Sequence, residues 1–187
     1  MLELPEDEFW FFEGFRPALS SLSVEPPAFL HEMAFVNLYA AFDGFVSDLL
    51  RARLQRHPQM MGGERQLRYE EIFGAPNKEA LLERMIEREV RDVMYQALTD
   101  VLATFRGRFG MTKLGSSRDA EAQRIALTRN CLLHNAGLVD SRLARVAPER
   151  PVGERIVIGH TEMSDACNVL RKLAYEIDRA DQGFAAG

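Results

Sequence analysis

The sequence contains little cysteine and no long uninterrupted apolar run. It has two cysteines in 187 residues, Cys131 and Cys167, and they form no CxxC pair. Both lie in apolar helical patterns, so we expect free buried thiols rather than a disulfide framework or a zinc ribbon. No stretch of about eighteen apolar residues occurs, and the N-terminus has acids where a signal peptide has basic residues. We therefore expect a cytoplasmic protein with no membrane partner.

An overall excess of positive charge is also missing. The formal net charge of −5 argues against a protein that coats nucleic acid, because such binding requires many Lys and Arg side chains. A local basic site is compatible with this charge. Between residues 122 and 155, six arginines and three acids give a local charge of +3. The arginines are Arg124, Arg129, Arg142, Arg145, Arg150 and Arg155.

The composition and the spacing of helix breakers predict one all-α domain over residues 1–187. Hydrophobic residues make up 47% of the chain, enough for one sizeable core. Apolar residues at three- and four-residue steps predict a long helix from about Ala28 to Arg56, and a second from Asn77 to about Phe109. Asn77 is a plausible cap for the second helix, which we expect to pack against the first.

The second half of the chain predicts two more helices. One runs from Arg118 to about Ala136 and ends at Gly137 in a left-handed conformation. The stretch Glu154–Gly159 reads as a short extended segment, and the last helix should begin near Thr161 or Ser164. The aromatic-dense N-terminal stretch DEFWFFEGF predicts a short helix or arm on the bundle, with an exposed aromatic patch as the alternative.

The third of these helices contains the stretch TRNCLLHNAGLVD, in which polar residues interrupt an apolar pattern. At about 100° per residue, apolar side chains cover most of the circumference, so we expect burial on more than one side. Arg129 lies in the main apolar stripe, whereas Asn130 and His134 share another face about 100° to 140° away. We therefore expect these polar groups to be buried or nearly so. A buried charge is costly unless it is paired, so they need a structural or a functional partner.

Two interpretations of this helix compete. In the structural one, Arg129 pairs with an acid of a neighbouring helix such as Asp43 or Asp48, and His134 bonds a carbonyl. The functional one rests on a resemblance: RNCLLHNAGLVD resembles the signature of the HEPN superfamily, in which Arg and a polar residue precede His by three variable residues. Arg129, Asn130 and His134 match these positions, and Asn135, Gly137, Val139 and Asp140 match the exit from the motif. The resemblance spans about residues 26–180 and is closest to bacterial stand-alone proteins of the RiboL-PSP-HEPN type.

The resemblance implies a particular fold and assembly. HEPN domains are bundles of four to five helices, with two long antiparallel helices before the motif and a short extended segment before the last helix. Family members form homodimers in which two motif helices face each other across one composite site. Because Arg129 and His134 diverge by about 140° around their helix, two facing copies would converge on one phosphate more readily than one copy.

The resemblance also implies a reaction and a role for each residue. Active members are metal-independent endoribonucleases without a cofactor, and they leave a 2′,3′-cyclic phosphate and a 5′-hydroxyl on RNA. His134 would act as general base or acid, since an unperturbed imidazole has a pKa of about 6.5. Arg129 would hold the scissile phosphate, and Asn130 would orient the imidazole or the phosphate. Arg124 and Asn135 are further candidates for phosphate binding. Many members are toxins or phage-defence effectors, which makes a cognate antitoxin a candidate partner.

Two other functional classes stay open. The first is a noncatalytic dimeric HEPN module that binds a nucleotide, RNA or protein, although such a scaffold needs neither Arg129 nor His134. The second is a helical structural or regulatory protein unrelated to HEPN. The basic cluster that contains Arg51, Arg53 and Arg56 predicts a solvated helix end, or less simply an RNA-contacting patch.

Metal and nucleotide sites are poorly supported. The stretch His31-Glu32 lacks the second histidine of HExxH, and a zinc set of Cys131, His134, His160 and Cys167 has unusual spacing. No GxxxxGK[ST] or GxGxxG motif occurs, so the sequence indicates no nucleotide-binding loop.

Overall fold

All regular structure in the described part of the chain is helical. The computed structural model describes residues 28–62 and 67–185. It contains seven α-helices, one 3₁₀ turn and no strand within those residues, which confirms the all-α class. The helices are α2 (Ala28–Arg56), α3 (Tyr69–Phe73), α4 (Lys78–Met94), α5 (Leu98–Arg106), α6 (Asp119–His134), α7 (Ser141–Val146) and α8 (His160–Ala185), with η2 at Pro58–Met60. The predicted number of four to five helices is too low, and the N-terminal stretch DEFWFFEGF lies outside the described residues.

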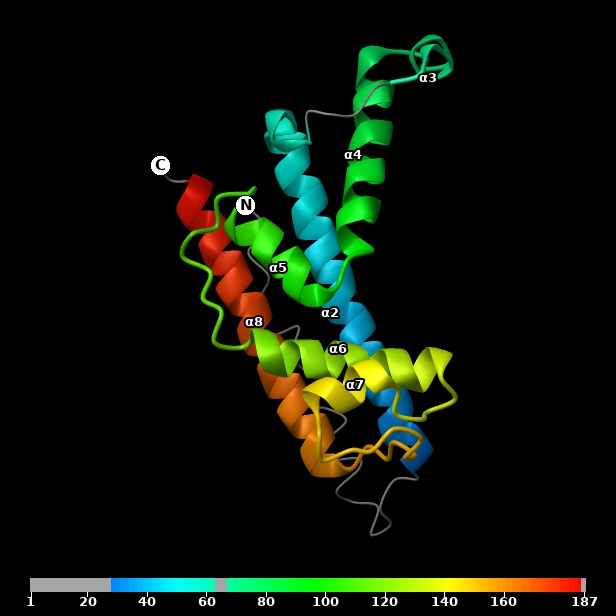
Figure 1. Ribbon diagram of the computed structural model, residues 1–187. Helices are drawn as coiled ribbons and strands as arrows, with labels where there is room; N and C mark the ends of the chain where they lie inside the picture. The colour runs from blue at the N-terminus through cyan, green and yellow to red at the C-terminus, as the bar shows by residue number, and fades with distance from the viewer. Residues whose placement is uncertain (1–27, 63–66, 186–187) are drawn as a thin grey trace.

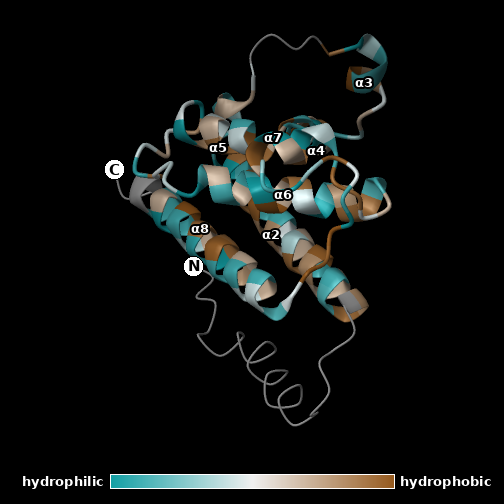
Figure 2. Cartoon of the chain, turned by 60° about the horizontal axis from the view of Figure 1, so that its bottom comes forward, coloured by the Kyte–Doolittle hydropathy of each residue, from teal (hydrophilic) through white to brown (hydrophobic). Residues whose placement is uncertain are grey.

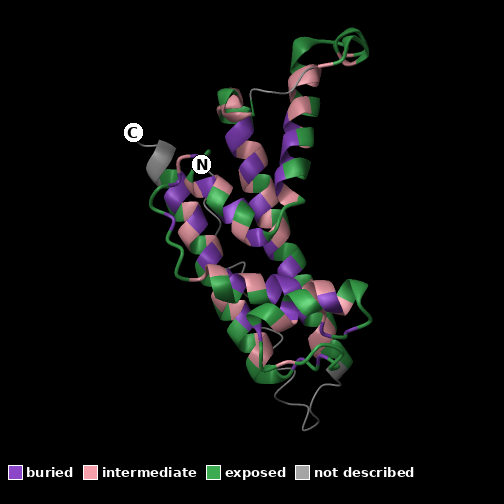
Figure 3. Cartoon of the chain, viewed as in Figure 1, coloured by how far each residue is buried: buried purple, intermediate pink, exposed green. Residues whose placement is uncertain are grey.

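Helix α2 is the central element and has the predicted bounds. It contacts α4, α6 and α8, and α4 returns antiparallel to it (Figure 1). Buried residues lie on the sides where the helices meet (Figure 3). On α2 these include Phe35, Phe42, Val46, Leu50 and Leu54. The apolar stripe read from the sequence is therefore the core face of this helix.

Helix α2 is unusually apolar, and part of its apolar surface is exposed. By length and hydropathy, Phe29–Arg56 is the one segment of the described residues that is long and apolar enough to cross a membrane, a test that core helices of soluble proteins also pass. Hydrophobic and hydrophilic residues alternate along both α2 and α8 (Figure 2). Much of the apolar surface of α2 is uncovered in the single chain. Its exposed apolar or small residues are Phe29, Leu30, Met33, Ala34, Ala40, Ala41 and Gly44.

The predicted helix from Asn77 to Phe109 is wrong as one continuous element. Asn77 does cap its start, because its side chain accepts a hydrogen bond from the Ala80 amide at 2.8 Å. The chain leaves the helix at Tyr95 and becomes extended at Ala97 before α5 begins. No Gly or Pro marks the break, and the apolar spacing continues through it, so periodicity could not reveal it. The break redirects α5 onto α6, and this tertiary packing outweighs helix propensity.

A buried ion pair joins α2 to α8. Arg53 and Asp181 are 2% and 6% exposed, and the Arg53 guanidinium donates to the Asp181 carboxylate and to the Phe109 carbonyl. The prediction of a solvated basic helix end is therefore wrong for Arg53. Arg51 is also engaged, with Asp48 at 2.6 Å and Glu87 at 2.5 Å. These pairs fix the C-terminal half of α2 against α4 and α8.

Helix α6 crosses α2 and α8 at a steep angle and also contacts α5 and α7 (Figure 1). It is buried on several sides, as predicted, and ends with Asn135 and Gly137 both donating to the Cys131 carbonyl at 3.0 Å. Ala136 and Gly137 have φ values of 52° and 73°, which confirms the left-handed exit at Gly137. These contacts fix the last turn of α6 relative to the chain that follows it.

The chain after α6 returns along an extended segment. An isolated antiparallel bridge joins Leu138 to Arg155, and the Ile156 amide donates to the Gly137 carbonyl at 2.8 Å. The segment Glu154–Gly159 is thus extended, as predicted. The last helix begins at His160, before the predicted Thr161 or Ser164, so neither of those residues is its cap.

We expect Asp181→Asn to lower the free energy of unfolding by roughly 3–5 kcal/mol, because it removes the carboxylate that pairs with the buried Arg53 cation. Denaturant unfolding at neutral pH measures this. Asp178→Asn on the same helix is the control. Burial and the neighbouring Asp181 raise the pKa of Asp178, so its charge opposes folding and its removal should not lower stability. Equal losses in both variants would contradict a specific role for the Arg53–Asp181 pair.

Candidate functional site

The three motif residues lie along the C-terminal half of α6. Arg129 and Asn130 are half-buried and in contact, with Arg129 Nη1 donating to Asn130 Oδ1 at 3.0 Å. His134 is the last residue of α6 and is exposed. The expectation that all three are buried is therefore wrong for His134. The neighbouring helices cover the middle of α6 but leave its final turn at the surface.

Arg129 rests against α2. Its guanidinium carbon lies 5.3 Å from the centroid of the Tyr39 ring, within the range of a cation–π contact. Tyr39 is 7% exposed and belongs to the core face of α2. The sequence prediction missed Tyr39, although it precedes Asp43 by four residues and so shares its helix face.

Asp43 lies within electrostatic range of Arg129, but no ion pair joins the two among the described residues. Burial raises the pKa of the half-buried Asp43 carboxyl, and the positive charge of Arg129 counters part of that rise. The other acid considered, Asp48, pairs with Arg51. The structural interpretation expected an ion pair between Arg129 and an acid of α2. Asp43 interacts with Arg129 electrostatically but does not form that ion pair.

The phenol of Tyr39 is unsuited to proton transfer near neutral pH. Burial, followed by the charge of Asp43, raises its pKa to about 12, while Arg129 acts in the opposite direction. Tyr39 is thus neutral at physiological pH and meets Arg129 as an aromatic ring.

Arg129 uses few of its hydrogen-bond donors. A guanidinium has five N–H groups, and within the described chain Arg129 donates only to Asn130. Its Nε is buried and has no hydrogen-bond partner there. Arg106 is a structural contrast, because it donates to both carboxylate oxygens of Asp119 and to the carbonyls of Leu114 and Gly115. Within the described chain, the only hydrogen bond of the Arg129 guanidinium is the one from Nη1 to Asn130.

The remaining predicted phosphate-binding residues have structural partners. Arg124 forms an ion pair with Glu149 at 3.2 Å. The Asn135 side chain donates to the Leu138 carbonyl at 2.8 Å and so stabilises the turn after α6. Asp140, in the exit of the motif, caps α7 by accepting from the amides of Arg142 and Leu143. The structure thus brings Arg129 and Asn130 together and gives Arg124 and Asn135 other contacts.

The cysteine of the motif helix lies in the core. Cys131 is buried, and burial raises the pKa of its thiol. The negative charge of Asp140 also raises this pKa, whereas the positive charge of Arg142 lowers it. Cys167 is a half-buried free thiol on α8. Among residues 28–62 and 67–185, no group of three or more His, Cys, Asp or Glu side chains is placed to hold a metal ion.

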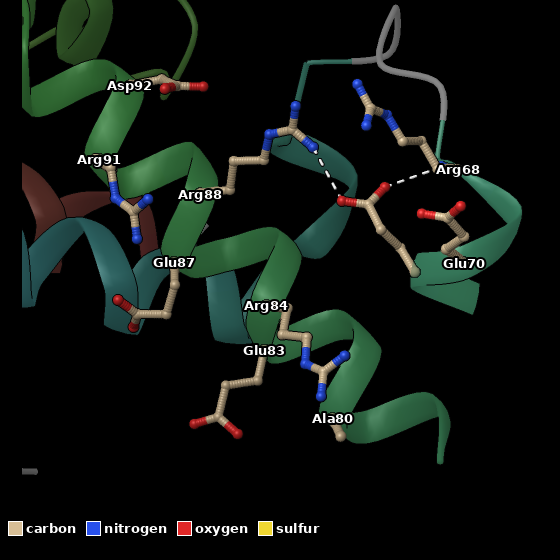
Figure 4. A pocket seen from close by; sticks show the side chains of 10 residues that line it. Arg68, Glu70, Ala80, Glu83, Arg84, Glu87, Arg88, Arg91 and Asp92 are labelled. Carbon is tan, nitrogen blue, oxygen red and sulfur yellow. Dashed lines mark hydrogen bonds and ion pairs between the residues drawn. The ribbon is translucent and has the colours of Figure 1, made fainter. Parts of the chain in front are cut away.

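A groove lies elsewhere, between α3 and α4 (Figure 4). It has a volume of about 910 Å³ and is lined by four arginines and five acids. Glu71 accepts there from the Arg68 amide at 2.9 Å and from Arg88 at 3.3 Å. Because the five acids outnumber the four arginines, the groove offers no net positive field for an anion. No motif residue lines it, so we assign no chemistry to it.

We expect Arg129→Gln to raise the pKa of Asp43 further, since burial then acts without the opposing charge. A carboxyl whose pKa is raised by folding loses its contribution to stability as pH rises from its unfolded pKa to its folded pKa. The variant, in which the folded pKa is higher, should therefore lose more stability than wild type as pH rises between these two values. Carbon-13 NMR titration of the Asp43 carboxyl measures the shift. Arg124→Gln, which removes a cation paired with Glu149, should leave the titration unchanged. The same Asp43 titration in wild type and Arg129→Gln would contradict the contact.

No protein-family model, curated protein or solved structure matches this chain. The case for its function therefore rests on the arrangement of Arg129, Asn130, His134 and Tyr39 described above.

Proposed function

We propose that this protein is a HEPN-type endoribonuclease, which cleaves RNA without a metal cofactor and acts as a homodimer. The observation that carries the proposal is the burial and the sparse hydrogen bonding of Arg129. A half-buried arginine that keeps most of its donors free, on the helix that ends in an exposed histidine, is suited to bind and cleave a phosphodiester. Two long antiparallel helices before α6 and an extended segment before α8 agree with the resemblance that motivates the family assignment.

The proposed reaction uses the RNA's own 2′-hydroxyl. One His134 removes the 2′-hydroxyl proton as that oxygen attacks phosphorus, and the bond from phosphorus to the 5′-oxygen breaks. The second His134 of the dimer donates a proton to the departing 5′-oxygen. Arg129 stabilises the charge that develops on the phosphorane oxygens. The products are a 2′,3′-cyclic phosphate and a 5′-hydroxyl.

The contact between Asn130 and Arg129 supports one of the two roles expected for Asn130. Its Oδ1 accepts from Arg129 Nη1 at 3.0 Å, while no hydrogen bond joins Asn130 to His134 in the described chain. We assign Asn130 to orienting the arginine, and through it the phosphate, rather than the imidazole.

The uncovered face of α2 supports the dimer. Ala34, Ala40, Ala41 and Gly44 are exposed, and a Cβ added at Gly44 would meet no atom within 4 Å. Small side chains permit close approach of a second helix, and apolar surface left in water favours association.

We expect wild-type protein to cleave RNA in the presence of EDTA and His134→Ala to reduce the rate by about 10²- to 10⁴-fold, since it removes the acid and the base. Arg129→Ala should reduce kcat by about 10²- to 10³-fold through lost phosphorane stabilisation. Gel-resolved cleavage of structured and single-stranded RNA, with analysis of product ends, measures both effects.

The matched control is His160→Ala, which removes an exposed histidine outside the motif, on α8. It should cleave at the wild-type rate. Wild type that binds RNA without cleaving it would favour the noncatalytic HEPN module instead. Wild type that neither binds nor cleaves RNA, or full activity in His134→Ala, would reject the nuclease proposal.

We expect Ala41→Glu to convert the dimer to a monomer and to abolish cleavage, because it places a charge in the proposed α2 interface. Glu is a good helix former, so the exposed substitution should leave the helix intact. Light scattering after size-exclusion chromatography gives the mass, and circular dichroism checks the fold. Gln55→Glu, which adds the same charge at the far end of α2, should remain dimeric. A wild-type monomer would contradict the proposed assembly.

A further inference from the structure

Among the described residues, Tyr39 is the aromatic side chain whose ring meets the guanidinium of Arg129. Its ring belongs to α2 and Arg129 to α6, so their contact crosses the interface between two core helices. Arg129 has only one other attachment in the described chain, the hydrogen bond to Asn130 on its own helix. An arginine side chain loses considerable rotamer freedom when it is fixed. The Tyr39 ring therefore largely determines where the guanidinium rests before a ligand arrives.

An aromatic ring and a carboxylate hold a guanidinium in different ways. The contact with Tyr39 is made through the π-electrons, so it uses none of the five N–H donors and leaves the positive charge intact. Arg53 differs, because its Nη1 donates to the Asp181 carboxylate, which balances its charge, and its Nη2 donates to the Phe109 carbonyl. An arginine placed by an aromatic ring is positioned and still able to bind a phosphate.

From this geometry, and on the basis of the proposed function, we infer that Tyr39 is a positioning residue that holds Arg129 for the RNA phosphate. The ring carries this role, and the hydroxyl contributes no proton. A phenol is neutral at physiological pH, and burial raises the pKa of Tyr39 still further, to about 12. Phenylalanine should therefore replace tyrosine at this position, whereas an aliphatic residue of similar size should not.

The chain offers a matched control in Phe42. It lies three residues further along α2, is equally buried, and has its ring centroid 6.1 Å from that of Tyr39. No ring contact joins Phe42 to Arg129 among the described residues. Phe42→Leu and Tyr39→Leu thus remove similar amounts of packing from one part of the core. Only the second removes the ring under the guanidinium.

The test compares cleavage by wild type, Tyr39→Phe, Tyr39→Leu and Phe42→Leu, with kcat and KM measured for one RNA oligonucleotide. We expect Tyr39→Phe within about twofold of wild type and Tyr39→Leu lower in kcat/KM by roughly threefold to thirtyfold, the strength of a cation–π contact. Phe42→Leu should remain within about twofold. Unfolding measurements confirm that all variants are folded at the assay temperature.

A second readout needs no RNA. In wild type and Tyr39→Phe, the ring should shift the NMR signal of the Arg129 Nε–H, and Tyr39→Leu should lose that shift while Phe42→Leu keeps it. If wild type cleaves RNA but Tyr39→Leu and Phe42→Leu are equally active, the inference fails and the proposed function stands. Loss of activity in Tyr39→Phe would also overturn it. If wild type neither binds nor cleaves RNA, the proposed function fails, and the role of Tyr39 fails with it even where the ring shift is seen.

Discussion

The contact between α2 and α6 is the constraint on which the candidate site depends. Helices α2, α5, α7 and α8 all contact α6, so a side chain near the middle of α6 has little access to water. Arg129 must therefore direct its guanidinium along α2, and Tyr39 and Asp43 are the residues that α2 offers there. An apolar residue at this position would fit the interface without the desolvation penalty that a half-buried cation incurs. The fold alone therefore does not account for the arginine, whereas the proposed role in binding phosphate would.

Two arginines of the core helices show how the same side chain serves different ends. Arg53 is fully buried, neutralised by Asp181 and bonded to a carbonyl, so it ties α2 to α8. Arg129 is half-buried, with a ring and an amide oxygen as its direct contacts and a carboxylate only at longer range. Neutral contacts leave the charge available, whereas an ion pair cancels it. Both burial and the pattern of partners distinguish the structural cation Arg53 from Arg129, the cation proposed to bind phosphate.

The sequence predicted the fold best where strong local signals were present. Prolines on both sides of α2 bracket it, and the Asn77 cap and Gly137 exit occur where the residue types predict them. The break between α4 and α5 was missed because the apolar spacing continues across it. The burial of Arg53 depends on Asp181, 128 residues away, and no local pattern reports such a pairing. The exposure of His134 was missed because a helical wheel shows direction around an axis but not where along it the neighbours end.

The motif residues of the candidate site could be predicted from the sequence, but the residue that packs against them could not. Arg129, Asn130 and His134 stand together in the sequence, so a local resemblance finds them, while Tyr39 comes from a helix about ninety residues earlier. The proposed dimer would also account for the separation of the motif residues within one chain. Arg129 lies against α2 and His134 at the exposed end of α6, about 140° apart around the helix. Under the proposed function, the groups that one copy cannot aim at a single phosphate are supplied by the other. The apolar face of α2, which one chain leaves uncovered, is the surface proposed for contact with that second copy.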